Sequence, residues 1–125
     1  MFHLIFTPHD LSGYEFQWLE RYDKYIVAKE YGKKEKHLHY HILIVTDAKH
    51  DTIRDMAKSR LHIPPGQRGK ESKYYALLSD WKDPGYICKS NDIQAYKGFS
   101  EKEIMEFVIS GRNKYPGKLE SPAGS

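Results

Sequence analysis

Residues 36–45 of the chain read Lys-His-Leu-His-Tyr-His-Ile-Leu-Ile-Val, so three of its seven histidines stand at every second position. Successive side chains of a β-strand point to opposite faces, which predicts a strand with His37, His39 and His41 on one face. Imidazoles on one strand face lie a few ångströms apart, a spacing suited to sharing one divalent metal ion. The opposite face is predicted to be core, and its residues are Leu38, Tyr40, Ile42 and Ile44.

A carboxylate precedes this strand and is predicted to lie beside the imidazoles. Residues 25–30 read as another strand, and the polar loop 31–36 contains a glycine, so the two strands form a predicted hairpin. Glu30 would then pair across from His37 or His39. Two imidazoles and a carboxylate with open coordination positions suit Mn²⁺ or Mg²⁺ acting on a phosphate. Three histidines and Glu30 would instead complete a structural zinc site, and both interpretations fit the pattern.

The length and composition of the chain predict one folded domain. It has 125 residues, of which 39% are hydrophobic and 30% charged, and its formal net charge is +3. These values favour a folded protein over a disordered chain. Cys88 is the only cysteine, which excludes an intrachain disulfide and a cysteine-rich zinc site and fits a reducing intracellular compartment. No apolar run approaches membrane-spanning length, so no membrane partner is expected.

Local patterns predict a mixture of strands and helices. Strands are expected at residues 2–7, 25–30, 37–46 and 61–63. Helices are expected over residues 11–21, from a cap at Asp51, over 71–78, from Pro84, and from a cap at Ser100 to a stop at Gly111. The predicted fold is an α+β domain, residues 1–117, with an antiparallel sheet and helices on one or both faces. Residues 118–125 are expected to be a flexible tail, either a linker or a cloning remnant.

The short helix predicted after Pro84 carries a candidate nucleophile. Residues three apart share a helix face, so Tyr86 and Lys89 are predicted to project together. A tyrosine phenol loses its proton at about pH 10, and a nearby cation and a metal-bound phosphate would help it react as phenolate. Tyr74 and Tyr75 are rival nucleophiles, because the helix predicted for them also carries Lys70 and Lys73.

Basic residues gather on either side of the histidine strand and are candidates for phosphate contacts. They are Lys33, Lys34 and Lys36 before the strand, and Arg68, Lys70 and Lys73 after it. Acidic residues are interspersed with them, so an ordinary solvated surface fits the same pattern. If nucleic acid is the partner, we expect these six residues to contact it.

Taken in order, these motifs resemble the HUH endonuclease domain of rolling-circle replication initiators, and most closely that of the Rep proteins of small circular single-stranded DNA viruses. Residues 5–8, Ile-Phe-Thr-Pro, fit the first motif of that family loosely. The histidine strand with Glu30 before it fits the second motif, and residues 86–89, Tyr-Ile-Cys-Lys, fit the third. The resemblance covers residues 4–89, and its specific feature is the order of three individually weak motifs. Plasmid initiators carry a similar His-Tyr-His strand and are the alternative within this class.

The resemblance implies a fold and an activity. The implied fold is a five-stranded antiparallel sheet with flanking helices, similar to RNA-recognition-motif folds. The implied activity is Mn²⁺- or Mg²⁺-dependent, sequence-specific nicking and joining of single-stranded DNA at an origin stem-loop, which initiates rolling-circle replication. Tyr86 would form a 5′-phosphotyrosine and leave a 3′-hydroxyl, and Lys89 would assist the phenolate or position phosphate. The metal pair is His37 with His39 or His39 with His41, and the unbroken apolar run after His41 favours the second.

The resemblance also bears on further domains and on location. Viral Rep proteins usually continue into a helicase domain, but the chain has no Gly-x-x-x-x-Gly-Lys-Ser/Thr loop, so we expect that domain to be absent from this chain. The expected location is the host nucleus for a protein of a eukaryotic virus and the cytoplasm otherwise. Two other classes fit the sequence, a non-catalytic nucleic-acid-binding module and a small zinc-stabilised adaptor.

Overall fold

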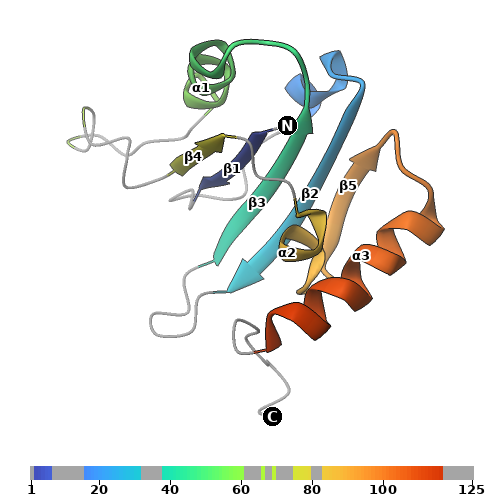
Figure 1. Ribbon diagram of the computed structural model, residues 1–125. Helices are drawn as coiled ribbons and strands as arrows, with labels where there is room; N and C mark the ends of the chain where they lie inside the picture. The colour runs from blue at the N-terminus through green and yellow to red at the C-terminus, as the bar shows by residue number, and fades with distance from the viewer. Residues whose placement is uncertain are drawn as a thin grey trace.

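The computed structural model describes residues 2–6, 16–31, 38–60, 66, 69, 75–79 and 83–116 (Figure 1). Its elements in chain order are β1 (Phe2–Phe6), the 3₁₀ helix η1 (Gln17–Arg21), β2 (Lys24–Tyr31), β3 (Leu38–Val45), α1 (His50–Lys58), β4 (Tyr75–Ser79), α2 (Pro84–Cys88), β5 (Ile93–Lys97) and α3 (Glu101–Lys114). Strands and helices are mixed along the chain, which confirms the predicted α+β class.

The strands form an antiparallel sheet in which β2 and β3 are neighbours. The strand order is β4-β1-β3-β2-β5, and each neighbouring pair is antiparallel. β2 and β3 pair over their whole length, from Lys24 with Val45 to Tyr31 with Leu38, which confirms the predicted hairpin. Such a long pairing specifies the register, because a slip of one residue would move every apolar side chain to the opposite face.

Helices cover both faces of this sheet. On one face Ile42 and Ile44 pack with buried residues of η1 and α1 in one apolar cluster, as predicted for the core face of the histidine strand. On the other face Leu43 packs with Ile87 of α2 and Val108 of α3 in a second, smaller cluster. Figure 1 shows α2 lying over the central strands, with α3 beside it. The two helices therefore cover the part of the histidine face around Leu43.

β4 and β5 differ from the sequence prediction. The sequence predicts a helix over residues 71–78, but residues 75–79 form β4, so this prediction is wrong. All of β4 pairs with β1, and this tertiary pairing outweighs the local helical preference. β5 has no counterpart in the prediction. Its segment Ile93–Lys97 pairs with β2 and lies between Asn91 (φ 57°) and Gly98 (φ 80°), two positions with positive φ at which the chain turns.

Two helix ends also differ from the prediction. α1 begins at His50 with Lys49 as its N-cap, so the predicted cap Asp51 lies in the first turn, where its charge favours the helix dipole. Gly111 does not end α3, which continues to Lys114. The glycine at position 111 instead permits a close contact with the backbone of Gly85 in α2.

The cap predicted before α3 is confirmed, since Ser100 and Glu103 form a reciprocal capping box. Of the helix predicted over 11–21, the described part is Phe16 followed by η1, a 3₁₀ helix. The strand predicted at 61–63 and the tail 118–125 lie outside the described residues. Among the helices that the structure describes, none has the length and apolar character needed to cross a membrane.

Candidate metal centre and nucleophile helix

The β2–β3 hairpin brings one carboxylate and two imidazoles together on one face of the sheet. Glu30 pairs directly with His39, and His41 pairs with Ala28, two residues before Glu30. Paired residues of antiparallel strands project to the same side. Each of the three polar side chains offers one ligand atom, and these atoms lie within 4.8 Å of one another. The structure thus groups Glu30, His39 and His41, whereas His37 lies outside the described residues.

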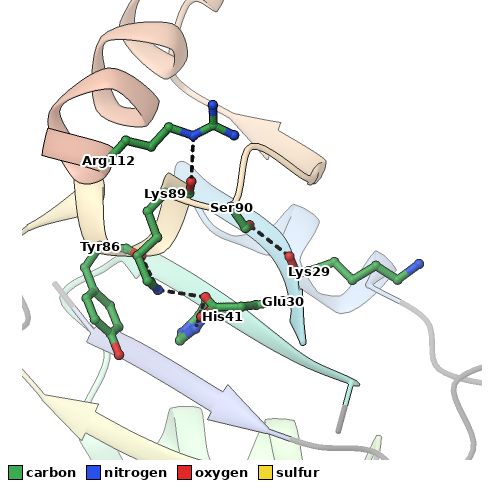
Figure 2. A network of polar contacts seen from close by, with 7 residues as sticks. All are labelled: Lys29, Glu30, His41, Tyr86, Lys89, Ser90 and Arg112. Atoms are coloured by element: carbon green, nitrogen blue, oxygen red, sulfur yellow. Dashed lines mark hydrogen bonds and ion pairs between the residues drawn. The ribbon is translucent and has the colours of Figure 1, made fainter. Parts of the chain in front are cut away.

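Glu30 lies at the centre of a buried polar network with His41 and Lys89 (Figure 2). Its Oε2 accepts a hydrogen bond from Lys89 Nζ at 2.7 Å and lies 2.8 Å from His41 Nε2. The side chains of Glu30, His41 and Lys89 are 10%, 2% and 0% exposed. Charges so far from water are screened less than surface ion pairs, so each of these groups strongly influences the protonation of the others.

The network sets the charge states of two of the candidate metal ligands, Glu30 and His41. Burial alone would raise the pKa of Glu30, but the hydrogen bonds and charges of His41 and Lys89 outweigh it and lower that pKa to about 2. Burial lowers the pKa of His41 below its ordinary value of 6.5, and the nearby Glu30 carboxylate only partly opposes this. At neutral pH Glu30 is therefore ionised and His41 is neutral, the states required of metal ligands.

The spacing of these donors fits a divalent metal ion. Metal–ligand bonds of about 2.1 Å place neighbouring donor atoms about 3 Å apart in an octahedral site. Glu30 Oε2 and His41 Nε2 are 2.8 Å apart, a hydrogen-bonding distance, and the ligand atom of His39 lies within 4.8 Å of both, so the three groups could hold one ion. Two imidazoles and one carboxylate leave coordination positions free for water or substrate.

The helix that carries Tyr86 is short and begins at a well-defined cap. Asp83 Oδ1 accepts a hydrogen bond from Gly85 N at 3.0 Å, and Pro84 occupies the first turn, as predicted. A helix of five residues has too few internal hydrogen bonds to be stable alone. Its position therefore depends on contacts with the rest of the protein.

Two of these contacts hold the far end of α2 (Figure 2). Ser90 Oγ donates to the carbonyl oxygen of Lys29 on β2 at 2.9 Å. Arg112 Nε of α3 donates to the carbonyl oxygen of Lys89 at 3.1 Å. α2 is thus fastened to the strand that carries Glu30 and to the helix beside it.

Tyr86 is half-buried beside the candidate metal ligands. Its ring centroid lies 5.4 Å from that of His41, and Lys89 Nζ lies 3.9 Å from the Tyr86 centroid. Burial and, to a smaller extent, the charge of Glu30 raise the pKa of the Tyr86 phenol above its ordinary value of 10. The resting phenol is therefore protonated, and its reaction requires additional positive charge at the site. Burial raises the pKa of Cys88 to about 12, so this thiol is a poor nucleophile.

Lys89 lies beside Tyr86, as predicted, but it is buried. Its Nζ donates to the carbonyl oxygen of Tyr86 at 3.1 Å and pairs with Glu30. From this position the ammonium pairs with the Glu30 carboxylate and lies over the Tyr86 ring, and it does not reach bulk solvent.

The described part of the chain places the backbone of one rival nucleophile and none of the basic candidates. Tyr75 lies in β4, not on the predicted helix, and Tyr74 lies outside the described residues. The six basic candidates also lie outside the described residues; they are Lys33, Lys34, Lys36, Arg68, Lys70 and Lys73.

Three residues that support α2 are absent from the sequence prediction. Asp83 could have been found, because an acidic residue before a proline is a common helix start. Arg112 binds Lys89, 23 residues earlier, and Tyr115 binds Asp83, 32 residues earlier. No local sequence pattern predicts contacts over such separations.

Comparisons of the chain with family models, curated proteins and solved structures found no significant match.

Proposed function

We propose that this protein is a metal-dependent single-stranded DNA endonuclease and ligase of the HUH class, acting through a covalent tyrosine intermediate. The observation that carries the proposal is the juxtaposition of Glu30, His39 and His41 with Tyr86, whose ring lies against that of His41. A metal centre beside a phenol suits phosphodiester transesterification, because the first activates the phosphate and the second attacks it. The choice of single-stranded DNA rests on the resemblance of the ordered sequence motifs.

In the proposed reaction the phenol oxygen of Tyr86 forms a bond to the scissile phosphorus, and the bond from phosphorus to the 3′ oxygen breaks. The phenol gives up its proton to solvent and the 3′ oxygen gains one, so the products are a 5′-phosphotyrosine and a 3′-hydroxyl. The reverse reaction joins the ends and needs no ATP. A divalent ion held by Glu30, His39 and His41 would polarise the scissile phosphate.

The surrounding residues assist the attack electrostatically. Lys89 Nζ lies over the Tyr86 ring and stabilises negative charge as it develops on the phenol oxygen. The same ammonium holds the Glu30 carboxylate in place at 2.7 Å. In this proposal Lys89 assists the phenolate and does not contact the phosphate.

The nature of the donors favours Mn²⁺ over Mg²⁺ as the working ion. Mg²⁺ is usually held by oxygen atoms alone, whereas imidazole nitrogen is a good ligand for the transition metals. Two of the three proposed ligands, His39 and His41, are imidazoles.

The finer features implied by the resemblance belong to the same proposal. They are the HUH arrangement of a five-stranded sheet, recognition of an origin stem-loop in rolling-circle replication, and phosphate contacts by the six basic candidates. The strand order β4-β1-β3-β2-β5, with the two histidines on β3, supports the first of these.

The test is covalent capture of DNA. The protein is incubated with a library of single-stranded hairpins and Mn²⁺, and a denaturing gel then separates any protein–DNA adduct. We expect an adduct that EDTA abolishes, that Tyr86→Phe abolishes, and that peptide mapping by mass spectrometry places on Tyr86. Tyr96→Phe, at an exposed tyrosine of β5, is the matched control and leaves the adduct intact.

Two results would overturn the proposal. A nucleotide found on Tyr74 or Tyr75 would move the nucleophile elsewhere. Metal binding without any adduct across the library would favour a zinc-stabilised adaptor or a non-catalytic nucleic-acid-binding module.

A further inference from the structure

The last turn of α3 lies directly against α2. A Cβ atom on Gly111 would lie 1.9 Å from the carbonyl oxygen of Gly85, so the two helix backbones touch and only glycine fits at position 111. One residue later, Arg112 donates its hydrogen bond to the backbone of Lys89. The end of α3 therefore sets the position of the short helix that carries Tyr86.

Tyr115 follows α3 and connects it to the start of α2. Its hydroxyl donates to Asp83 Oδ2 at 2.5 Å, while Asp83 Oδ1 caps α2 through Gly85 N. The backbone N–H of Tyr115 donates to the carbonyl oxygen of Gly111 at 2.9 Å. Lys114 Nζ lies 3.6 Å from the same Oδ2 and adds a positive charge. One carboxylate thus ties the first turn of α2 to the Tyr115 side chain.

The ring of Tyr115 also contacts the ring of Tyr86 directly. Their centroids are 5.2 Å apart with an interplanar angle of 89°, an edge-to-face arrangement. Tyr86 makes a second edge-to-face contact with His41, at 5.4 Å and 83°. Contacts of this kind are attractive and depend on orientation, so they restrict the direction in which a ring points.

We propose that Tyr115 is a positioning residue for Tyr86. Its ring keeps the Tyr86 phenol against the metal ligands, and its hydroxyl bond to Asp83 keeps the Tyr115 ring in place. The inference rests on the proposed function in one respect, since it takes Tyr86 as the nucleophile. Misplacing a reacting group by about 1 Å can reduce a rate about 100-fold, so the loss of Tyr115 affects the chemical step and not DNA affinity.

The effect of Tyr115 on the environment of the Tyr86 ring can be measured without any catalysis. 3-Fluorotyrosine is incorporated at position 86, and its ¹⁹F resonance is compared in the natural chain, Tyr115→Ala and Tyr115→Phe. We expect a resonance shifted far from that of the free amino acid in the natural chain, and slightly less far in Tyr115→Phe, which keeps the ring but loses the bond to Asp83. Tyr115→Ala moves it toward the free value and narrows it, because the ring gains mobility. Asn113→Ala, at an exposed residue of the same turn, is the control and leaves it unchanged.

The catalytic consequence is read from single-turnover cleavage at saturating DNA. Tyr115→Ala lowers the rate constant about 30-fold, while Tyr115→Phe and Asp83→Asn, which keep the ring and the cap acceptor, lower it about 3-fold. The dissociation constant for DNA stays within about 2-fold in all three variants. A thermal melt of each variant checks that the fold is intact, and a structural defect alone would lower the active fraction without changing the rate constant.

The outcomes separate this inference from the proposed function. If the natural chain forms no adduct, the proposed function is overturned, while the fluorine resonance still tests whether Tyr115 holds Tyr86. If the adduct forms but Tyr115→Ala neither slows cleavage nor moves the resonance, Tyr115 has no positioning role and the proposed function stands. A resonance that moves without any change in rate also overturns the inference.

Discussion

The two faces of the sheet bury very different side chains, although the same two strands build much of both. On the face covered by η1 and α1, Ile42 and Ile44 of β3 meet apolar partners throughout their cluster. On the face covered by α2 and α3, Leu43 packs in a smaller apolar cluster. His41, on the same face, belongs to a buried polar network with Glu30 and Lys89. One face is an ordinary core, and the other combines a core with buried charges.

This difference is what the proposed metal site would require, since the second face buries charges that the first does not. Removing an ion pair from water costs several kcal/mol, and apolar side chains of similar volume often stabilise a fold as well or better. The first face demonstrates that this fold can bury apolar residues against a helix in the ordinary way. If the proposed function holds, the charged residues of the second face serve the metal site, and the two faces should respond differently to substitution.

The largest effect is expected on the apolar face. Ile42 is fully buried, so Ile42→Ala removes packed methyl groups and leaves a cavity, which lowers the free energy of unfolding by about 4 kcal/mol. Chemical denaturation measures this loss. The Mn²⁺ affinity of the folded fraction stays within about 3-fold, because Ile42 points away from the histidine face. A large loss of Mn²⁺ affinity in this variant would mean that the two faces are not independent.

Breaking the buried pair on the other face has a smaller but distinctive effect. Glu30→Ala leaves the ammonium of Lys89 buried without its carboxylate, which lowers the free energy of unfolding by about 3 kcal/mol. Replacing both residues, Glu30→Met with Lys89→Met, removes both charges and recovers most of that stability while Mn²⁺ binding is lost. Chemical denaturation and calorimetric titration provide the two readouts. A double variant less stable than Glu30→Ala would show that the charges serve the fold itself.

The contact between α2 and α3 is tested at Gly111. Gly111→Ala places a methyl group against the carbonyl oxygen of Gly85 and forces α2 away from α3, which lowers the free energy of unfolding by about 2 kcal/mol. Because α2 carries Tyr86, the rate of adduct formation also falls, by more than the loss of folded protein explains. The neighbouring substitution Ser110→Ala is the control, with little change in either quantity. Normal adduct formation in Gly111→Ala would contradict the dependence of Tyr86 on α3.

The smallest effect concerns pH. Burial holds the pKa of His41 below 6.5 in the folded protein. As the pH falls, the unfolded chain therefore binds a proton at this residue before the folded protein does. Between about pH 7.5 and about pH 5.5 the free energy of unfolding therefore falls by about 1 kcal/mol on account of this residue. Denaturation curves in EDTA, with His41→Gln as reference, isolate the contribution. An equal slope in both proteins would contradict a neutral, buried His41.

The hairpin and the grouping of the ligands could be predicted because they depend on local patterns. The alternation around His39 defines the two strand faces, and the glycine-containing loop places Glu30 opposite it. The cap at Ser100 and the proline at the start of α2 are equally local signals. Such signals need only the neighbouring residues, so the sequence alone contains them.

The features of the site that the sequence does not predict depend on contacts between distant segments. Lys89 is fully buried because it meets Glu30, 59 residues away, and no local pattern predicts a buried lysine. Gly111 has the sequence signature of a helix stop, yet its lack of a side chain serves the contact with Gly85. Tyr115 gains its contact with Tyr86 only when α3 packs on α2.

The central claim is that Glu30, His39 and His41 form a metal site beside Tyr86. It is tested most directly by calorimetric titration of the metal-free protein with Mn²⁺, with the natural chain and His39→Ala measured side by side. We predict one ion per chain for the natural protein and an affinity at least about 10-fold lower for His39→Ala, with His50→Ala, on α1, unchanged. No binding by the natural chain, or equal binding by His39→Ala, would contradict the account.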